Sequence, residues 1–179
     1  MDGMSKRDKL ELAYKAHIFD VYNDYLELPD GRKVIYDYID HVDGACILPI
    51  CDDGDMILVS QYRNVIDRIS YEAPGGCMDE GETPDESARR ELREETGYLV
   101  DELDYVANTV LAIGSSNEHT AVFIGYGLSK TDVSPDENEF IHVHKLSVKQ
   151  VDEMIAKGDI VDSKTLLAIM AYKAKNVNS

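Results

Sequence analysis

The chain has 179 residues and a formal net charge of −17, and 44% of its residues are hydrophobic. This length suits one domain, or one domain with a small appendage, and it is sufficient for a buried core. The acidic balance argues against nucleic-acid binding through phosphate contacts, and no apolar run approaches the roughly 18 residues of a membrane span. With no signal-like start and three cysteines that lack metal-type spacing, we expect a cytoplasmic protein with reduced thiols and no membrane partner.

The N-terminal part is predicted to form a β-hairpin. Residues 17–28 and 32–41 are rich in Tyr, Ile and Val, and the turn signal Pro29-Asp30-Gly31 separates them. The preceding residues 6–16 are ambiguous between a short helix and a frayed lead-in. Because an isolated hairpin is only marginally stable in water, it must pack on the main domain or on a second copy of the chain.

Two further strands are predicted at residues 45–50 and 56–62, around an Asp-Gly turn at residues 52–55. Arg63 follows the second of these strands. A single arginine is usually a surface cation. Here it comes shortly before a glycine-rich turn, Glu72-Ala-Pro-Gly-Gly76, so we interpret it as an anion-binding residue.

Strong helix signals follow the glycine turn. Thr83 is a good N-cap, Pro84 suits the first helical position, and Glu86 completes a capping box. Gly97 fits the position after the last helical residue. The sequence therefore predicts a helix over Pro84–Thr96.

Three carboxylates, those of Glu91, Glu94 and Glu95, fall within an arc of about 100° on this helix. Arg90 can pair with Glu94 along the helix surface, but one arginine cannot neutralise all three. A solvated surface helix is the usual interpretation of such charges. The glycine turn just before this helix favours a divalent metal instead, and oxygen ligands favour Mg²⁺ or Mn²⁺ over Zn²⁺.

Beyond the helix, strands are predicted at residues 103–112, 120–128 and 140–146, and they enclose a polar loop at residues 113–119 and an acidic one at residues 131–139. His142 and His144 share one strand face, so a paired-histidine metal site is conceivable without an evident third ligand. Ser147 is the expected cap of a helix over residues 148–157 that ends at Gly158. A final helix is expected over residues 163–175.

The segment from Gly76 to Tyr98 resembles the signature of the Nudix hydrolases, G-x5-E-x7-R-E-U-x-E-E-x-G-U. It matches at every fixed position, and only Tyr98 departs from the usual aliphatic residue at the end. The fixed positions are Gly76, Glu82, Arg90, Glu91, Leu92, Glu94, Glu95 and Gly97. Shorter motifs extend the resemblance toward the ADP-ribose pyrophosphatase branch: LPDG at residues 28–31, HVDGA at 41–45, QYR at 61–63, EAPGG at 72–76, DENEF at 136–140 and DSKTL at 162–166.

The resemblance implies a role for each matching residue. Glu91 and Glu95 would ligate the metals, Glu94 would assist, and the Gly75 carbonyl would add a backbone ligand. Glu82 would brace the loop onto the helix, and Arg90 would orient the carboxylates. Glu137 resembles the general base and Glu139 an added metal ligand, and these two roles are exchangeable. Arg63 and Glu118 would contact the nucleotide sugar, with Gly76 beside them. The family more often has a Ser-Pro-Gly run before the position of Glu118.

The expected architecture is an α/β (α+β) Nudix fold in which a mixed β-sheet is sandwiched between helices. Residues 1–42 would form an N-terminal hairpin and dimerisation part, and residues 43–179 the Nudix domain. We therefore expect a Mg²⁺-dependent homodimer that hydrolyses a nucleoside diphosphate sugar, with ADP-ribose split to AMP and ribose 5-phosphate. The alternatives are GDP-mannose or another nucleotide sugar as substrate, or a non-catalytic module that senses a nucleotide.

Overall fold

The computed structural model describes residues 4–131 and 140–176. Its residues form two compact units. The first contains the described residues up to Asp43 together with Val110–His119, and the second contains Gly44–Thr109 and the described residues from Thr120 onward. The N-terminal part predicted from the sequence ended at residue 42, so the structure adds a second, distant segment to it.

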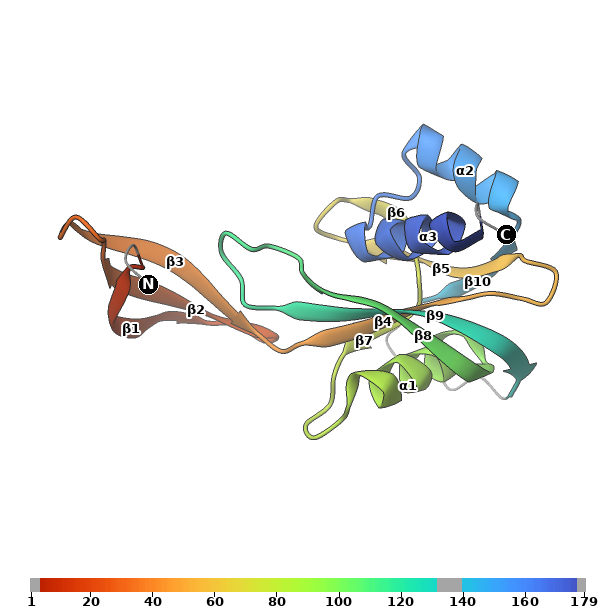
Figure 1. Ribbon diagram of the computed structural model, residues 1–179, viewed down its shortest axis with the longest axis horizontal. Coiled ribbons are helices and arrows are strands. Elements are labelled where there is room, and N and C mark those ends of the chain that lie inside the picture. The colour runs from red at the N-terminus through yellow and green to blue at the C-terminus, as the bar shows by residue number, and fades with distance from the viewer. Residues whose placement is uncertain (1–3, 132–139, 177–179) are drawn as a thin grey trace. The chain divides into compact units, whose positions relative to one another are not determined.

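The first unit is a three-stranded antiparallel sheet in the order β1-β2-β3 (Figure 1). Its strands are β1 (Lys6–Lys15), β2 (Phe19–Glu27) and β3 (Lys33–His41). The predicted hairpin is confirmed, since β2 and β3 pair without a break from Phe19 with His41 to Glu27 with Lys33.

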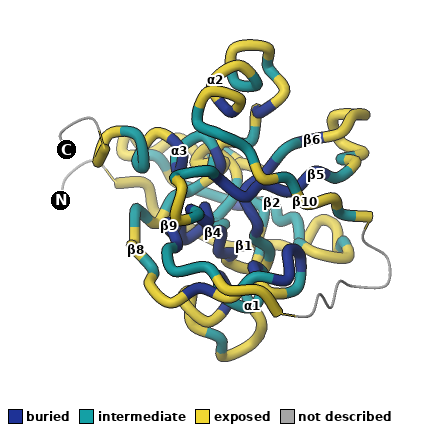
Figure 2. The backbone as a smooth tube through the Cα atoms, turned by 90° about the vertical axis from the view of Figure 1, so that its right-hand side faces the viewer, coloured by how far each residue is buried: buried dark blue, intermediate teal, exposed yellow. Residues whose placement is uncertain are grey.

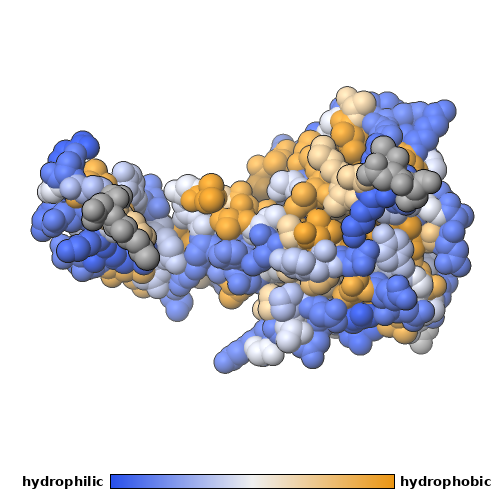
Figure 3. All heavy atoms as spheres, in the orientation of Figure 1, coloured by the Kyte–Doolittle hydropathy of each residue, from blue (hydrophilic) through white to orange (hydrophobic). Residues whose placement is uncertain are grey.

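The segment before this hairpin is a strand, neither the short helix nor the frayed lead-in that the sequence left open. Leu10, Leu12 and Tyr14 alternate with other residues at the period of a strand, and β1 pairs with β2 along its length with two irregularities in register. Every residue of β1 is exposed. Hydrophilic residues cover most of the visible face of the three-stranded sheet (Figure 3).

Residues 110–119 join the first unit through hydrogen bonds to β3. The Ile39 amide donates to the Ser115 carbonyl (2.7 Å), and the Asn117 amide donates to the Ile39 carbonyl (3.2 Å). The Asn117 side chain accepts from the His41 amide (2.9 Å) and donates to the Asp40 carboxylate (2.7 Å). The polar loop expected here is therefore fastened to the N-terminal sheet.

The second unit contains two sheets. One has the order β7-β4-β9-β8 and the other the order β10-β5-β6. Within the first sheet β4 is parallel to β9 and antiparallel to β7, so the sheet is mixed. The strands are β4 (Gly44–Pro49), β5 (Met56–Arg63), β6 (Arg68–Glu72), β7 (Gly75–Cys77), β8 (Tyr98–Val110), β9 (His119–Lys130) and β10 (His142–Leu146).

The helices are α1 (Pro84–Thr96), α2 (Val148–Lys157) and α3 (Ser163–Asn176). Thr83 and Glu86 form the expected capping box of α1, and Gly97 ends the helix in the left-handed conformation. Helix α2 likewise begins after the N-cap residue Ser147, which forms a capping box, and ends at Gly158 in the left-handed conformation, as predicted. Local side chain to backbone bonds thus define both helices.

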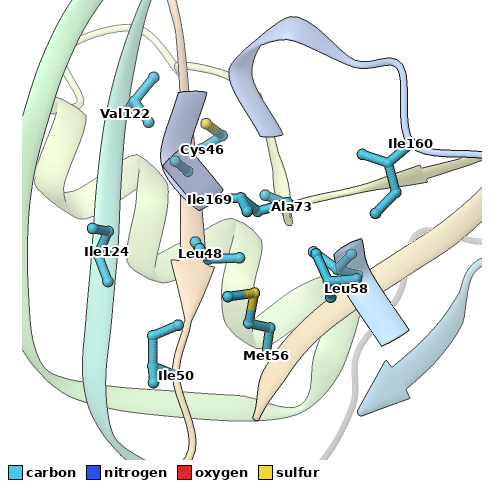
Figure 4. Packing of buried hydrophobic residues seen from close by; sticks show 12 residues of the cluster. Cys46, Leu48, Ile50, Met56, Leu58, Ala73, Val122, Ile124, Ile160 and Ile169 are labelled. Carbon is cyan, nitrogen blue, oxygen red and sulfur yellow. The ribbon is translucent and has the colours of Figure 1, made fainter. Parts of the chain in front are cut away.

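Strand β4 separates two hydrophobic cores. All six of its residues are buried, and its tube is dark blue in Figure 2. Because side chains alternate along a strand, Ala45 and Ile47 pack toward α1, with Leu92 among their neighbours. Cys46 and Leu48 point to the opposite face, toward α3 (Figure 4). The sheet that contains β4 lies between α1 on one face and α2 and α3 on the other (Figure 1). This arrangement confirms the predicted α+β architecture, in which a mixed sheet is sandwiched between helices.

Cys46, Cys51 and Cys77 are free thiols, as predicted. In the part of the chain that the structure describes, no helix has the length and apolar character needed to cross a membrane.

Candidate active site

A cavity of 380 Å³ in the second unit collects most of the residues that the sequence singled out. Its wall comes from the end of β5, from β7 and the loop after it, and from one face of α1. The lining residues are Gln61, Arg63, Gly75, Gly76, Cys77, Asp79, Arg90, Glu91, Glu94 and Glu95. The helix face and the glycine turn therefore meet at one site.

Close backbone approach explains the two glycines of this wall. A Cβ at Gly75 would lie 2.4 Å from the Ala45 carbonyl oxygen and 2.6 Å from the Cβ of Cys46. A Cβ at Gly76 would lie 2.6 Å from Oε1 of Glu91. Any side chain at either position displaces β4 or the Glu91 carboxylate, so the turn needs glycine to reach α1.

Arg90, in the middle of α1, is the centre of an ion-pair network. Its Nη1 donates to Oε1 of Glu91 (2.6 Å) and Oε2 of Glu94 (3.2 Å), the latter being the pair expected from the sequence. Its Nε and Nη2 each donate to Glu82 (2.9 Å), and Nη2 also donates to the Cys77 carbonyl (3.0 Å). One guanidinium thus joins the loop to the helix and orients two carboxylates.

Glu82 connects the loop to this network from the other side. Its Oε2 accepts a hydrogen bond from the Asp79 amide (3.0 Å) as well as from Arg90. The hydrogen bonds from Arg90 hold the pKa of Glu82 at about 2, well below its ordinary value. Glu82 is therefore ionised at neutral pH and fixes the loop between residues 77 and 82.

Glu95 is the most deeply buried of the three helix carboxylates, with 7% of its surface exposed. Its Oε2 accepts a hydrogen bond from the Gly75 amide (3.1 Å), which joins α1 to the glycine turn. The side chains of Glu91 and Glu94 are 14% and 31% exposed. Burial of one carboxylate beside two others is costly, which favours a cation in this position.

The donor chemistry of this wall fits a hard divalent cation. Three carboxylates and the backbone at Gly75 and Gly76 offer oxygen atoms along one cavity. Among the described residues, no group of three or more His, Cys, Asp or Glu side chains is arranged to hold a metal ion. Glu91 and Glu95 are turned toward Arg90 and the Gly75 amide instead. The described residues thus supply suitable donors without a complete ligand set.

Arg63 lies at the cavity wall in a bidentate pair with Glu72. Its Nε and Nη2 donate to the two carboxylate oxygens at 2.8 and 2.7 Å. Lys164 lies on the other side of this carboxylate, with Nζ 3.5 Å from Oε2 of Glu72. Burial alone raises the pKa of Glu72, but the Arg63 hydrogen bonds and the Lys164 charge bring it down to about 2. Arg63 is therefore held rigidly at the site.

The described lining of this cavity does not include the other residues predicted from the sequence. Glu118 belongs to the first unit, where its amide donates to the Ser116 hydroxyl (3.2 Å). Glu137 and Glu139 lie outside the described residues. His144 shares a hydrogen bond with Ser60 (2.8 Å) and packs against the Tyr71 ring, and within the described chain no histidine joins a metal-type cluster.

Sequence reasoning gave no role to several residues near this site. Gln61 and Asp79 line the cavity, and Lys164 contacts Glu72 from α3. The sequence did contain a signal for Lys164, since Asp162 and Lys164 belong to the DSKTL motif at residues 162–166. Only the packing of α3 brings them to the glycine turn.

Comparisons with known proteins agree with this geometry. The NUDIX domain model matches residues 40–168. The ADP-ribose pyrophosphatase of Bacillus subtilis (strain 168) is 29% identical over 92% of this chain and 90% of that protein. The Methanol dehydrogenase activator of Bacillus methanolicus is 28% identical over the same shares. The GDP-mannose pyrophosphatase of Yersinia enterocolitica is 30% identical over 87% of this chain and 86% of that protein.

The fold also has a solved counterpart. A crystal structure described as an ADP compounds hydrolase superposes with a TM-score of 0.86 and covers 97% of this chain and 95% of that one. The two sequences are 20% identical, so this similarity concerns the fold.

Proposed function

Because this chain belongs to the Nudix family and is a hydrolase, we propose that it cleaves the pyrophosphate bond of a nucleoside diphosphate sugar. ADP-ribose is the first candidate, with AMP and ribose 5-phosphate as products. The observation that carries this proposal is the cavity in which the carboxylates of α1 meet the glycine turn. Water supplies the oxygen that joins one phosphorus atom as the bridging P–O bond breaks.

Nudix hydrolases generally use divalent metal ions, and four described residues are our proposed ligands here. Glu91, Glu95 and the Gly75 carbonyl would hold the ions, with Glu94 assisting. Glu139 is a further proposed ligand from beyond the described residues. Bound metal would screen the charge of the diphosphate and acidify a water molecule. We propose Mg²⁺, with Mn²⁺ as a substitute, because oxygen donors prevail.

The protein's own groups position this chemistry. Arg90 holds Glu91 and Glu94 through the hydrogen bonds described above, and Glu82 keeps Arg90 in place. We propose Glu137 as the general base, with its role exchangeable with that of Glu139. A positioned base of this kind contributes roughly 10²- to 10⁴-fold to a rate.

Substrate recognition is proposed for Arg63, Gly76 and Glu118. Arg63 lines the cavity beside the two glycines, and its rigid pairing with Glu72 presents a fixed guanidinium edge there. A guanidinium suits the oxygens of phosphate and sugar groups. The Bacillus subtilis relative, named as an ADP-ribose pyrophosphatase, supports ADP-ribose as the first candidate.

A second substrate candidate is GDP-mannose. It is favoured by the Yersinia enterocolitica relative, which is named for that substrate and aligns with most of this chain. A module that binds a nucleotide without hydrolysis is less favoured, because Glu91, Glu94 and Glu95 are all present and all line the cavity.

The deciding experiment is a hydrolysis assay in Mg²⁺ over a panel of nucleoside diphosphate sugars. The panel contains ADP-ribose, GDP-mannose, ADP-glucose and UDP-glucose, with products identified by ³¹P NMR. We expect AMP and ribose 5-phosphate from ADP-ribose, the highest kcat/KM for that substrate, and no turnover in EDTA. A parallel run in oxygen-18 water identifies the phosphorus that is attacked.

The outcomes separate the candidates. A higher kcat/KM for GDP-mannose than for ADP-ribose replaces the first substrate with the second. Calorimetric binding of a nucleotide sugar without any hydrolysis in Mg²⁺ indicates a sensing module. Failure to hydrolyse every compound of the panel contradicts the proposal.

The assembly and location of the enzyme are also proposals. A homodimer is supported by the exposed strand β1 and by the resemblance of residues 1–42 to the N-terminal part of the ADP-ribose pyrophosphatases. A cytoplasmic location is supported by three free cysteine thiols. Analytical ultracentrifugation tests the dimer directly.

A further inference from the structure

The first turn of α3 contacts the glycine turn, although the proposed reaction gives it no role. Asp162, just before the helix, accepts hydrogen bonds at Oδ2 from the Thr165 amide (3.0 Å) and hydroxyl (2.5 Å). Its Oδ1 accepts from Lys164 Nζ (2.8 Å). Thr165 then accepts a hydrogen bond at Oγ1 from the Ala73 amide (2.7 Å). The hydrogen bonds at the start of α3 thereby continue to the glycine turn, 92 positions earlier in the chain.

A hydroxyl group is required at Thr165 because it both donates and accepts. It donates to Asp162 and accepts from Ala73, and both Thr165 and Ala73 are almost completely buried, at 0% and 2% exposure. Water has no ready access to replace this bond. A buried amide without an acceptor is unfavourable, so loss of the hydroxyl forces the Ala73 backbone to move or remain unsatisfied.

Three successive residues of the turn are held by three different elements. The Ala73 amide is bound by Thr165 of α3, the Pro74 carbonyl accepts from the Ile47 amide of β4 (2.9 Å), and the Gly75 amide donates to Glu95 of α1 (3.1 Å). At Gly75 the backbone packs so closely against β4 that no space remains for a Cβ atom. A shift at Ala73 is therefore transmitted to Gly75 and its bond with Glu95.

We propose that Thr165, oriented by Asp162, is a positioning residue that sets the place of the Gly75 backbone against Glu95 and thereby the affinity of the site for a divalent metal. This inference rests on the proposed function insofar as Gly75 and Glu95 are metal ligands. It gives the C-terminal helix a part in the active site without any contact between that helix and substrate.

The test measures Mn²⁺ binding to the free enzyme by electron paramagnetic resonance, alongside kcat and KM in Mg²⁺. Thr165→Val removes the hydroxyl at nearly constant volume, and Thr165→Ser restores it. Thr109→Val is the control, because the Thr109 hydroxyl likewise joins two segments: it donates to the Thr120 carbonyl (3.2 Å) between β8 and β9. Asp162→Ala is a second variant that removes the acceptor orienting Thr165.

We expect Thr165→Val to weaken Mn²⁺ binding about tenfold, the order of effect of one unsatisfied buried donor. Thr165→Ser should bind within twofold of wild type, and Asp162→Ala should bind about threefold more weakly. Thr109→Val should lower the Tm without changing Mn²⁺ affinity. If Thr165→Val does not fold, Asp162→Ala decides the question.

Unchanged Mn²⁺ affinity in Thr165→Val, or in Asp162→Ala where the first variant is unfolded, overturns the inference and leaves the proposed function standing. The same loss of affinity in Thr109→Val and Thr165→Val also overturns it, because general destabilisation then explains both. A wild-type protein that binds no Mn²⁺ contradicts the proposed metal site itself and this inference with it.

Discussion

Two charged networks flank the glycine turn, and they differ in how far apart their members lie in the sequence. Arg90 joins Glu82, Glu91, Glu94 and the Cys77 carbonyl, all within 13 positions of itself. The other network joins Arg63 and Glu72 to Lys164 in the first turn of α3 and to Asp162 just before that helix. The first network needs only a helix and the loop before it. The second exists only when α3 has packed on the sheet.

We therefore expect the two networks to have different roles at the site. The local network orients the carboxylates that would hold the metal, whereas the long-range network holds the turn and Arg63 against them. Charge is satisfied in both, because no buried side-chain nitrogen or oxygen in the described chain lacks a hydrogen-bond partner. Loss of a carboxylate that faces the proposed metal should therefore act mainly on turnover, whereas loss of the carboxylate that anchors either network should act mainly on stability.

The largest expected effect is on turnover, from Glu95→Gln. Glutamine keeps the shape and can still accept from the Gly75 amide, but it removes the charge of the most buried helix carboxylate. We expect kcat to fall roughly 100-fold or more with a nearly unchanged Tm, as for loss of one preorganised charged group. Glu102→Gln on the exposed part of β8 is the control. Near wild-type activity in Glu95→Gln would refute the site assignment.

The next effect concerns acid stability, and it should appear in both networks. Hydrogen bonds from Arg90 lower the pKa of Glu82 to about 2. The pKa of Glu72 is also about 2, because Arg63 and Lys164 outweigh the effect of burial. Since both values lie below the ordinary 4.5, the stabilisation is complete above about pH 4.5 and is lost as the pH falls toward 2.

Urea unfolding as a function of pH measures this contribution. Glu72→Gln and Glu82→Gln should each lower the free energy of unfolding by about 2 kcal/mol at pH 7. The difference from wild type should shrink as the pH falls below about 4.5. Glu102→Gln should show no such dependence. A constant difference down to pH 3 in either variant would mean that its carboxylate is not held by its cations.

The smallest effect is expected from the helix caps. Thr83→Ala and Ser147→Ala remove the same kind of capping box from α1 and α2, and each should lower the free energy of unfolding by about 1 kcal/mol. Thr83→Ala should leave kcat close to wild type, because Glu91, Glu94 and Glu95 lie beyond the first turn of α1. A tenfold loss of kcat in Thr83→Ala alone would show that the local network depends on the cap.

Helices α1 and α2 were predicted to the residue because their ends are encoded locally. The strands were harder to place. Residues 6–16 alone do not decide between a helix and a lead-in, although Leu10, Leu12 and Tyr14 alternate, because it is the pairing with β2 that makes β1 a strand. β8 begins at Tyr98, five residues before the predicted start, directly after the Gly97 cap. Tyr98, the one departure from the family signature, packs against the core beneath α1.

The sequence by itself determined the signature from Gly76 to Tyr98, the capped helix within it and the face that carries three carboxylates. These features depend on neighbours a few positions away, whose geometry a helix fixes. Only the tertiary structure decided that residues 110–119 join the N-terminal sheet and that Thr165 binds the Ala73 amide. Such contacts join segments far apart in the chain, and they form where packing brings a buried donor to an acceptor.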